Sequence, residues 1–108
     1  MTHLFLIRGI PIYGDLILAP MAGFSDVPYR LICREFGMAM SYTEVISMDG
    51  VLWGNEKTFR LINFMPVERP ITFQIMGNDD DKITDACRRI EQLGPDIIDV
   101  NMGCSVAD

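Results

Sequence analysis

The chain has 108 residues, of which 49% are hydrophobic and 22% charged, and 15 Asp+Glu against 9 Lys+Arg give a formal net charge of −6. This composition excludes a disordered tail, a collagen-like repeat and a disulfide-stapled miniprotein. The acidic balance argues against a free-standing nucleic-acid binder, which normally presents a basic face. The length suits one domain of modest size, but the positive mean hydropathy is high for a small domain that stands alone.

The cysteines and the apolar segments indicate where the protein works. No segment reaches the ~18–20 consecutive apolar residues that a membrane-spanning helix needs, and the N-terminus lacks the pattern of a signal peptide. Cys33, Cys87 and Cys104 are odd in number, widely spaced and without CxxC or CxxH pairs. That usage fits a reducing compartment and offers no zinc site. We therefore expect a cytoplasmic protein that uses neither a membrane nor a metal.

The first elements in chain order are short strands. Residues 4–8 and 10–14 are β-prone segments around Gly9, which predicts a small hairpin. Residues 15–20 form a continuous apolar run closed by Pro20. Such a run is typical of a strand that is buried on both faces of a parallel sheet.

A helix is predicted over residues 27–37. Ser25 or Asp26 can cap its start, a proline is tolerated in its first turn, and Gly37 can end it. Four apolar residues fall on one face, which is helical spacing: Val27, Leu31, Ile32 and Phe36.

The same alternation of strands and helices continues along the chain. Residues 38–46 predict a second strand, residues 48–63 helical structure interrupted at Gly54, and residues 71–76 a third buried strand.

A longer helix and a fourth strand complete the chain. Asp79, Asp80 and Asp81 supply the cap and first-turn negative charge of a helix that extends to Leu93. Its apolar stripe is Ile83, Ala86, Cys87, Ile90 and Leu93. Residues 96–103 then predict the fourth strand.

Strands that alternate with helices predict right-handed βαβ units and a parallel sheet. About four such units follow the N-terminal hairpin, and four are half of an eight-unit barrel. We therefore expect an α/β fold in which residues 1–108 form a partial domain, the N-terminal half of a (β/α)8 TIM barrel whose remainder is absent. The alternative is a small, complete, open α/β domain.

Ligands of parallel α/β proteins lie beyond the carboxyl ends of the strands. Here those ends fall at residues 19–23, 43–44, 74–77 and 101–104, which carry amides, a carboxylate, a thiol and glycines. They contain no histidine, no pair of carboxylates and no phosphate-binding glycine motif. Amides beside exposed backbone suit the donor and acceptor edge of a flat heterocycle. We therefore expect a conjugated ring cofactor.

The thiols in this pattern are not equivalent. Cys104 follows a glycine at a strand end, where a thiol can face a pocket and donate a proton or, when activated, attack. A small buried residue is the other interpretation of Cys104. Cys33 and Cys87 lie within predicted helices and are interpreted as packing residues.

The polar residues at the strand ends also allow two interpretations. Gln74 and Asn101 either contact a ligand or satisfy backbone groups of the loops. Glu44 is a ligand contact, a loop cap or a surface charge.

Four segments, residues 18–30, 43–58, 69–81 and 93–104, together resemble the amino-terminal half of the tRNA-dihydrouridine synthase family, in the family's order and spacing. The resemblance covers nearly the whole chain. It implies a flavin-binding (β/α)8 barrel, which in this family is followed by a helical domain that is absent from the chain.

The resemblance also implies a reaction. These enzymes use FMN, reduced by NADPH, to reduce the C5–C6 double bond of particular uridines in tRNA. Residues that match the family's flavin contacts are Pro20, Met21, Ala22, Gln74 and Asn101. Cys104 matches the catalytic proton donor of the N-x-G-C motif, which protonates C5 after flavin N5 delivers hydride to C6.

The chain departs from the family pattern at Ser105, where the family usually has a proline that would restrict the loop. The family's later lysine and histidine, its phosphate-binding loops and its basic tRNA-binding domain would follow Asp108. We therefore expect the chain alone to be inactive. The alternatives are another FMN-dependent barrel oxidoreductase, similar to dihydroorotate dehydrogenase, and a non-catalytic half-barrel whose edge strands pair with another chain.

Overall fold

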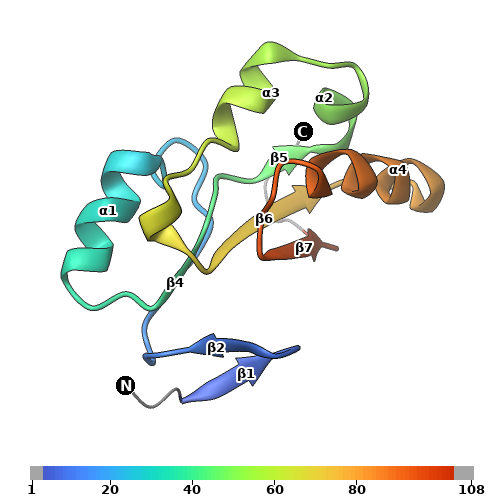
Figure 1. Cartoon of the computed structure of the whole chain (residues 1–108). Coiled ribbons are helices and arrows are strands. Elements are labelled where there is room, and N and C mark those ends of the chain that lie inside the picture. The colour runs from blue at the N-terminus through green and yellow to red at the C-terminus, as the bar shows by residue number, and fades with distance from the viewer. Residues whose placement is uncertain (1–3, 104–108) are drawn as a thin grey trace.

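The structure, a computed structural model, describes residues 4–103, which form a mixed α/β fold around a parallel sheet (Figure 1). The strands of this sheet are β3 (Ile17–Leu18), β4 (Met40–Tyr42), β5 (Ile46–Ser47), β6 (Ile71–Met76) and β7 (Ile97–Asn101). The pairs β3–β4, β4–β6, β5–β6 and β6–β7 are all parallel. The predicted parallel α/β fold is therefore confirmed, and the described strands form an open sheet with β3 and β7 outermost.

The core lies on one face of β6. Ile71, Phe73 and Ile75 alternate along this strand and are fully buried. They pack against α2 (Met48–Leu52) and α4 (Asp80–Glu91), which contribute residues such as Val51 and Ile90 to the same cluster. Period-two alternation then places the intervening polar residues of β6 on the opposite face, away from this core.

Local capping explains where the helices begin. Asp26 accepts a hydrogen bond from the Tyr29 backbone N–H at the start of α1 (Val27–Glu35). Asp79 accepts one from the Lys82 N–H at the start of α4. Asn55 caps α3 (Glu56–Leu61), which follows the predicted interruption. The starts of α1 and α4 agree with the prediction, because a capping side chain acts within its own turn.

The apolar face of α1 is buried only in part, because Val27 and Leu31 are half-buried. Ile32 and Phe36 are 56% and 81% exposed, whereas the buried residue of the helix is Arg30, at 1% exposure. Apolar spacing identifies one side of the helix, but Arg30 has a buried carboxylate partner that periodicity does not reveal.

The strand predicted over residues 38–46 is divided into two, and the strand predicted over residues 15–20 is neither long nor buried. Thr43, Glu44 and Val45 separate β4 from β5, and both pieces pair along β6 on the edge opposite β7. In β3, Ile17 remains 44% exposed, because β4 is the one strand paired with it among the described residues.

The predicted hairpin is confirmed. Strands β1 (Phe5–Ile7) and β2 (Ile10–Ile12) pair antiparallel. Arg8 and Gly9 both have positive φ, 45° and 85°, at the two-residue turn between them, which is the geometry that a tight hairpin turn needs. Figure 1 shows the hairpin apart from α2 and α3, toward the other end of the fold.

Candidate active site

A row of hydrogen-bonded side chains crosses from β6 to β7. Gln74 and Asp99 are register partners, and Gln74 Nε2 donates to Asp99 Oδ2 over 2.6 Å. Asn101 Nδ2 donates to Gln74 Oε1 over 3.4 Å, and Asn101 Oδ1 accepts from the Gly103 backbone N–H over 2.9 Å. We call Asp99, Gln74 and Asn101 the amide row.

The amide row lies on the face of the sheet that does not carry the apolar core. Phe73 and Ile75 point into that core, so Gln74 between them points the other way. Asp99 and Asn101 share its face, since they are two residues apart on β7. The structure therefore joins Gln74 and Asn101, and it adds Asp99, which the sequence analysis did not single out although the alternation of residues 96–103 carries that signal.

The loop after β3 holds the other predicted flavin contacts, Pro20, Met21 and Ala22. Its backbone is held from within, because Ser25 Oγ accepts from the Met21 N–H over 2.9 Å and donates to the Met21 carbonyl over 3.1 Å. Met21 can therefore offer a ligand its side chain more readily than its backbone. The loop follows a strand parallel to β6 and β7, so it lies at the carboxyl end of the sheet.

Glu44 acts as a cap on this same loop. The Gly23 N–H donates to Glu44 Oε1 over 2.6 Å. Gly23 has φ +81°, a conformation that other residues rarely adopt. Of the three interpretations left open for Glu44, the structure thus supports the loop cap.

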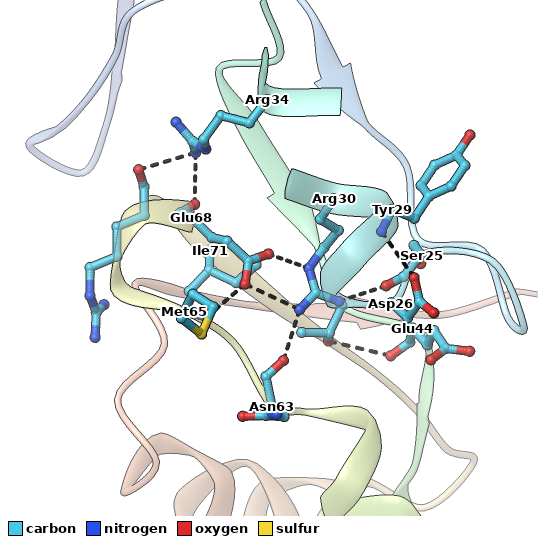
Figure 2. A network of polar contacts seen from close by, with 12 residues as sticks. Ser25, Asp26, Tyr29, Arg30, Arg34, Glu44, Asn63, Met65, Glu68 and Ile71 are labelled. Carbon is cyan, nitrogen blue, oxygen red and sulfur yellow. Dashed lines mark hydrogen bonds and ion pairs between the residues drawn. The ribbon is translucent and has the colours of Figure 1, made fainter. Parts of the chain in front are cut away.

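A buried ion pair lies next to this loop (Figure 2). Arg30 Nε donates to Glu68 Oε1 over 2.5 Å, and the side chains are 1% and 0% exposed. Arg30 also donates to the Ser25 carbonyl over 2.6 Å and to the Asn63 carbonyl over 2.8 Å. Glu68 Oε2 accepts from the Met65 N–H over 2.7 Å. Arg30 thus ties the start of α1 to the segment before β6.

Burial raises the pKa of two side chains in or near the site. It raises the pKa of the Tyr42 hydroxyl, and the negative charge of Asp99 raises that pKa further. Tyr42 pairs in register with Thr72, on the same face of the sheet as Gln74. Burial also raises the pKa of the Cys87 thiol, which agrees with its interpretation as a packing residue.

Cys104 lies outside the described residues, so its predicted role stays a prediction. Within residues 4–103 there is no group of three or more His, Cys, Asp or Glu side chains placed to hold a metal ion. None of the helices in this same range is long and apolar enough to cross a membrane.

The groups left over on the polar face fit a flat heterocycle. Gln74 and Asn101 each retain one N–H and one lone pair after the contacts of the amide row are counted. Thr72 Oγ1 on this face is buried and has no partner within the described residues. The remaining donors and acceptors of the two amides suit the edge of a nitrogen heterocycle better than they suit a cation.

Parallel strands, helices packed on one face and polar side chains toward the carboxyl ends define the class of α/β proteins that bind ligands at that end of the sheet. A sequence profile of the family described as Dihydrouridine synthase (Dus) matches residues 17–107. The chain belongs to this dihydrouridine synthase family.

Curated relatives agree with that assignment. The chain is 42% identical over 94 residues to tRNA-dihydrouridine synthase B of Pseudomonas syringae pv. tomato, covering 86% of this chain and 28% of the relative. It is 44% identical over 94 residues to a probable tRNA-dihydrouridine synthase of Aquifex aeolicus, covering 86% and 29%. For the tRNA-dihydrouridine synthase B of Escherichia coli, the identity is 37% over 91 residues, covering 82% and 28%. The chain thus spans under a third of the length of these relatives.

Proposed function

We propose that the chain supplies the N-terminal part of the catalytic barrel of an FMN-dependent tRNA-dihydrouridine synthase. The observation that carries this proposal is the amide row, which stands on the polar face of a parallel sheet in a chain of this family. The relatives named tRNA-dihydrouridine synthase B are more than three times as long as the segment that this chain matches. Residues 1–108 are accordingly a partial domain in this proposal.

The open sheet supports a half-barrel. Strands β3, β4, β6 and β7 follow one another in the order of the chain, each parallel to the next, as consecutive strands do in a (β/α)8 barrel. In this arrangement the polar face of β6 and β7 becomes the barrel interior. The helices that cover the other face become part of the outer ring.

The residues of this chain would hold and orient the reactants. Gln74 and Asn101 would hydrogen-bond the flavin and uracil edges, and the loop containing Pro20, Met21 and Ala22 would line the ring. When bound, FMN supplies hydride, with NADPH as the reductant. Cys104 would donate the proton to uridine C5 from its thiol. The proposed substrate is tRNA, bound mainly through parts that follow this chain, and the proposed setting is the cytoplasm.

A segment exchange tests the proposal. The matching segment of the Pseudomonas syringae relative is replaced by this chain and expressed in a bacterium without dihydrouridine synthases of its own. We expect purified protein with flavin absorbance, and dihydrouridine in the tRNA measured by mass spectrometry. A protein without flavin or without dihydrouridine contradicts the proposal. The chain expressed alone is expected to form no dihydrouridine, and NADPH-dependent tRNA reduction by these 108 residues would overturn its status as a part.

Cysteine variants of the exchanged protein test the proton donor. Cys104→Ala should keep the flavin and lower the rate of uridine reduction by about 10²-fold or more, the usual effect of losing a general acid. Cys87→Ala is the matched control, because Cys87 packs against the apolar core and should leave the rate near that of the parent. Equal rates in the Cys104→Ala variant and the parent would remove the assignment.

A further inference from the structure

Asp99 occupies the first position of the amide row without belonging to the predicted flavin contacts. Its carboxylate accepts from Gln74 Nε2 over 2.6 Å, across two adjacent strands. An ionised carboxylate can only accept hydrogen bonds. The contact therefore turns the NH2 group of the Gln74 amide, rather than its oxygen, toward Asp99. A neutral neighbour that can both donate and accept would not specify this orientation.

The orientation passes from one amide to the next. With its nitrogen turned to Asp99, Gln74 must present Oε1 to the other side, where Asn101 Nδ2 donates over 3.4 Å. Asn101 then presents Oδ1, which accepts from the Gly103 N–H over 2.9 Å. The Gly103 N–H can only donate, so the acceptor at Asp99 and the donor at Gly103 specify the same direction for the row from its two ends.

Asp99 has no competing task among the described residues. It takes part in none of the ion pairs within residues 4–103. It is half-buried on the polar face of β7, and its charge is felt by the Tyr42 hydroxyl across the sheet. A half-buried carboxylate that no described cation pairs with costs desolvation energy, and the strong hydrogen bond from Gln74 offsets part of that cost.

We propose that Asp99 is a positioning residue, which acts through Gln74 and together with the Gly103 N–H to fix the direction in which both amides of the row offer N–H and C=O groups to a heterocycle. The proposal rests on the proposed function for the identity of that heterocycle. It assigns to this chain a determinant of which ring edge is accepted. Reversing the row would present donors where acceptors stand and acceptors where donors stand.

The first test needs no cofactor and uses the 108-residue chain. Hydrogen exchange of the side-chain NH2 groups of Gln74 and Asn101 is followed by nuclear magnetic resonance. Asp99→Asn should speed exchange at both amides by about tenfold, because a charge-assisted hydrogen bond is lost. Asp99→Glu keeps an accepting carboxylate and should restore most of the protection. Asp85→Asn is the matched control, because its carboxylate is exposed on α4.

The outcome at Asn101 decides the proposal. Faster exchange at both amides supports an orientation that is passed along the row. Faster exchange at Gln74 with an unchanged Asn101, or no change at either residue in the folded Asp99→Asn chain, overturns it.

A second test uses the segment-exchanged protein and FMN affinity, measured by flavin fluorescence. Asp99→Asn should weaken FMN binding about tenfold. The double variant Asp99→Asn, Gln74→Glu restores a strand-to-strand hydrogen bond with donor and acceptor exchanged. It should therefore protect Asn101 again, and an FMN affinity of the single variant Asp99→Asn equal to that of the parent would overturn the proposal. If the parent exchange protein binds no FMN, the proposed function fails, and the exchange rates in the chain still decide the role of Asp99.

Discussion

Removing the Glu68 carboxylate should destabilise the protein strongly. Glu68 accepts from Arg30 Nε over 2.5 Å, from Arg30 Nη2 over 3.4 Å and from the Met65 N–H over 2.7 Å. In Glu68→Ala the guanidinium remains buried and loses its counter-charge. Breaking a buried ion pair from one side costs about 3–5 kcal/mol. Because Arg30 keeps its bonds to the Ser25 and Asn63 carbonyls, we expect the lower end, about 3 kcal/mol.

Urea unfolding followed by circular dichroism measures this loss. With a denaturant slope of about 1.5–2 kcal/mol per molar, a loss of about 3 kcal/mol lowers the midpoint by roughly 1.5–2 M. The matched control is Asp85→Ala, which breaks an ion pair of 3.4 Å whose side chains are 52% and 55% exposed. An exposed pair of this kind contributes at most about 0.5 kcal/mol.

The comparison of the two variants carries the test. If Glu68→Ala and Asp85→Ala shift the midpoint equally, the reasoning from burial is refuted. Should Glu68→Ala not fold, Glu68→Gln provides the second measurement, since it keeps one acceptor oxygen and the side-chain volume. We expect it to be less stable than the parent, because its NH2 group replaces an oxygen that accepts from an N–H donor. A Glu68→Gln chain as stable as the parent would refute the reasoning as well.

Two further predictions concern packing and titration. In Gly50→Ala the new Cβ would overlap Thr58 Oγ1, so we expect the free energy of unfolding in urea to fall by about 1–3 kcal/mol and to recover in part when Thr58→Ala is added. The control is Gly103→Ala, which should change the free energy little because nothing lies within 4 Å of its new Cβ. Equal losses in the two variants would contradict this account. The raised pKa of Tyr42 stabilises the folded chain below the unfolded tyrosine pKa of about 10, and that stabilisation is lost as the pH rises through the higher folded pKa. Asp99→Asn should lower the Tyr42 pKa while burial keeps it above its ordinary value, which tyrosinate absorbance checks by difference from Tyr42→Phe; an unchanged Tyr42 titration in Asp99→Asn would show that Asp99 does not act on it.

Features set by neighbouring residues could be predicted from the sequence. Asp26 and Asp79 cap the helices that follow them, and each cap involves residues three positions apart. The apolar run of β6 also identified a buried strand. In each case the physical cause lies within a few residues, where periodicity and capping preferences act.

Features that depend on distant partners could not be predicted. Arg30 is buried because Glu68, 38 residues later in the chain, neutralises it. Glu44 interrupts a strand and caps Gly23, which precedes it by 21 residues. Asp99 gains its place in the site from Gln74 on the neighbouring strand. Composition and spacing hold no record of these pairings. The sequence therefore identified the amides of the site and offered a loop cap as one interpretation of Glu44, but it did not single out Asp99 or pair Arg30 with Glu68.

Alternate residues of strand β6 have two different roles, packing in the core and forming the site. Ile71, Phe73 and Ile75 contact the hydrocarbon interior, while Gln74 faces the amide row. A library of substitutions along this strand should therefore give two kinds of defective variant in alternation, one that fails to accumulate and one that accumulates without working. Ligand preference in such a strand can be redesigned at every second residue while the residues that secure the fold stay unchanged.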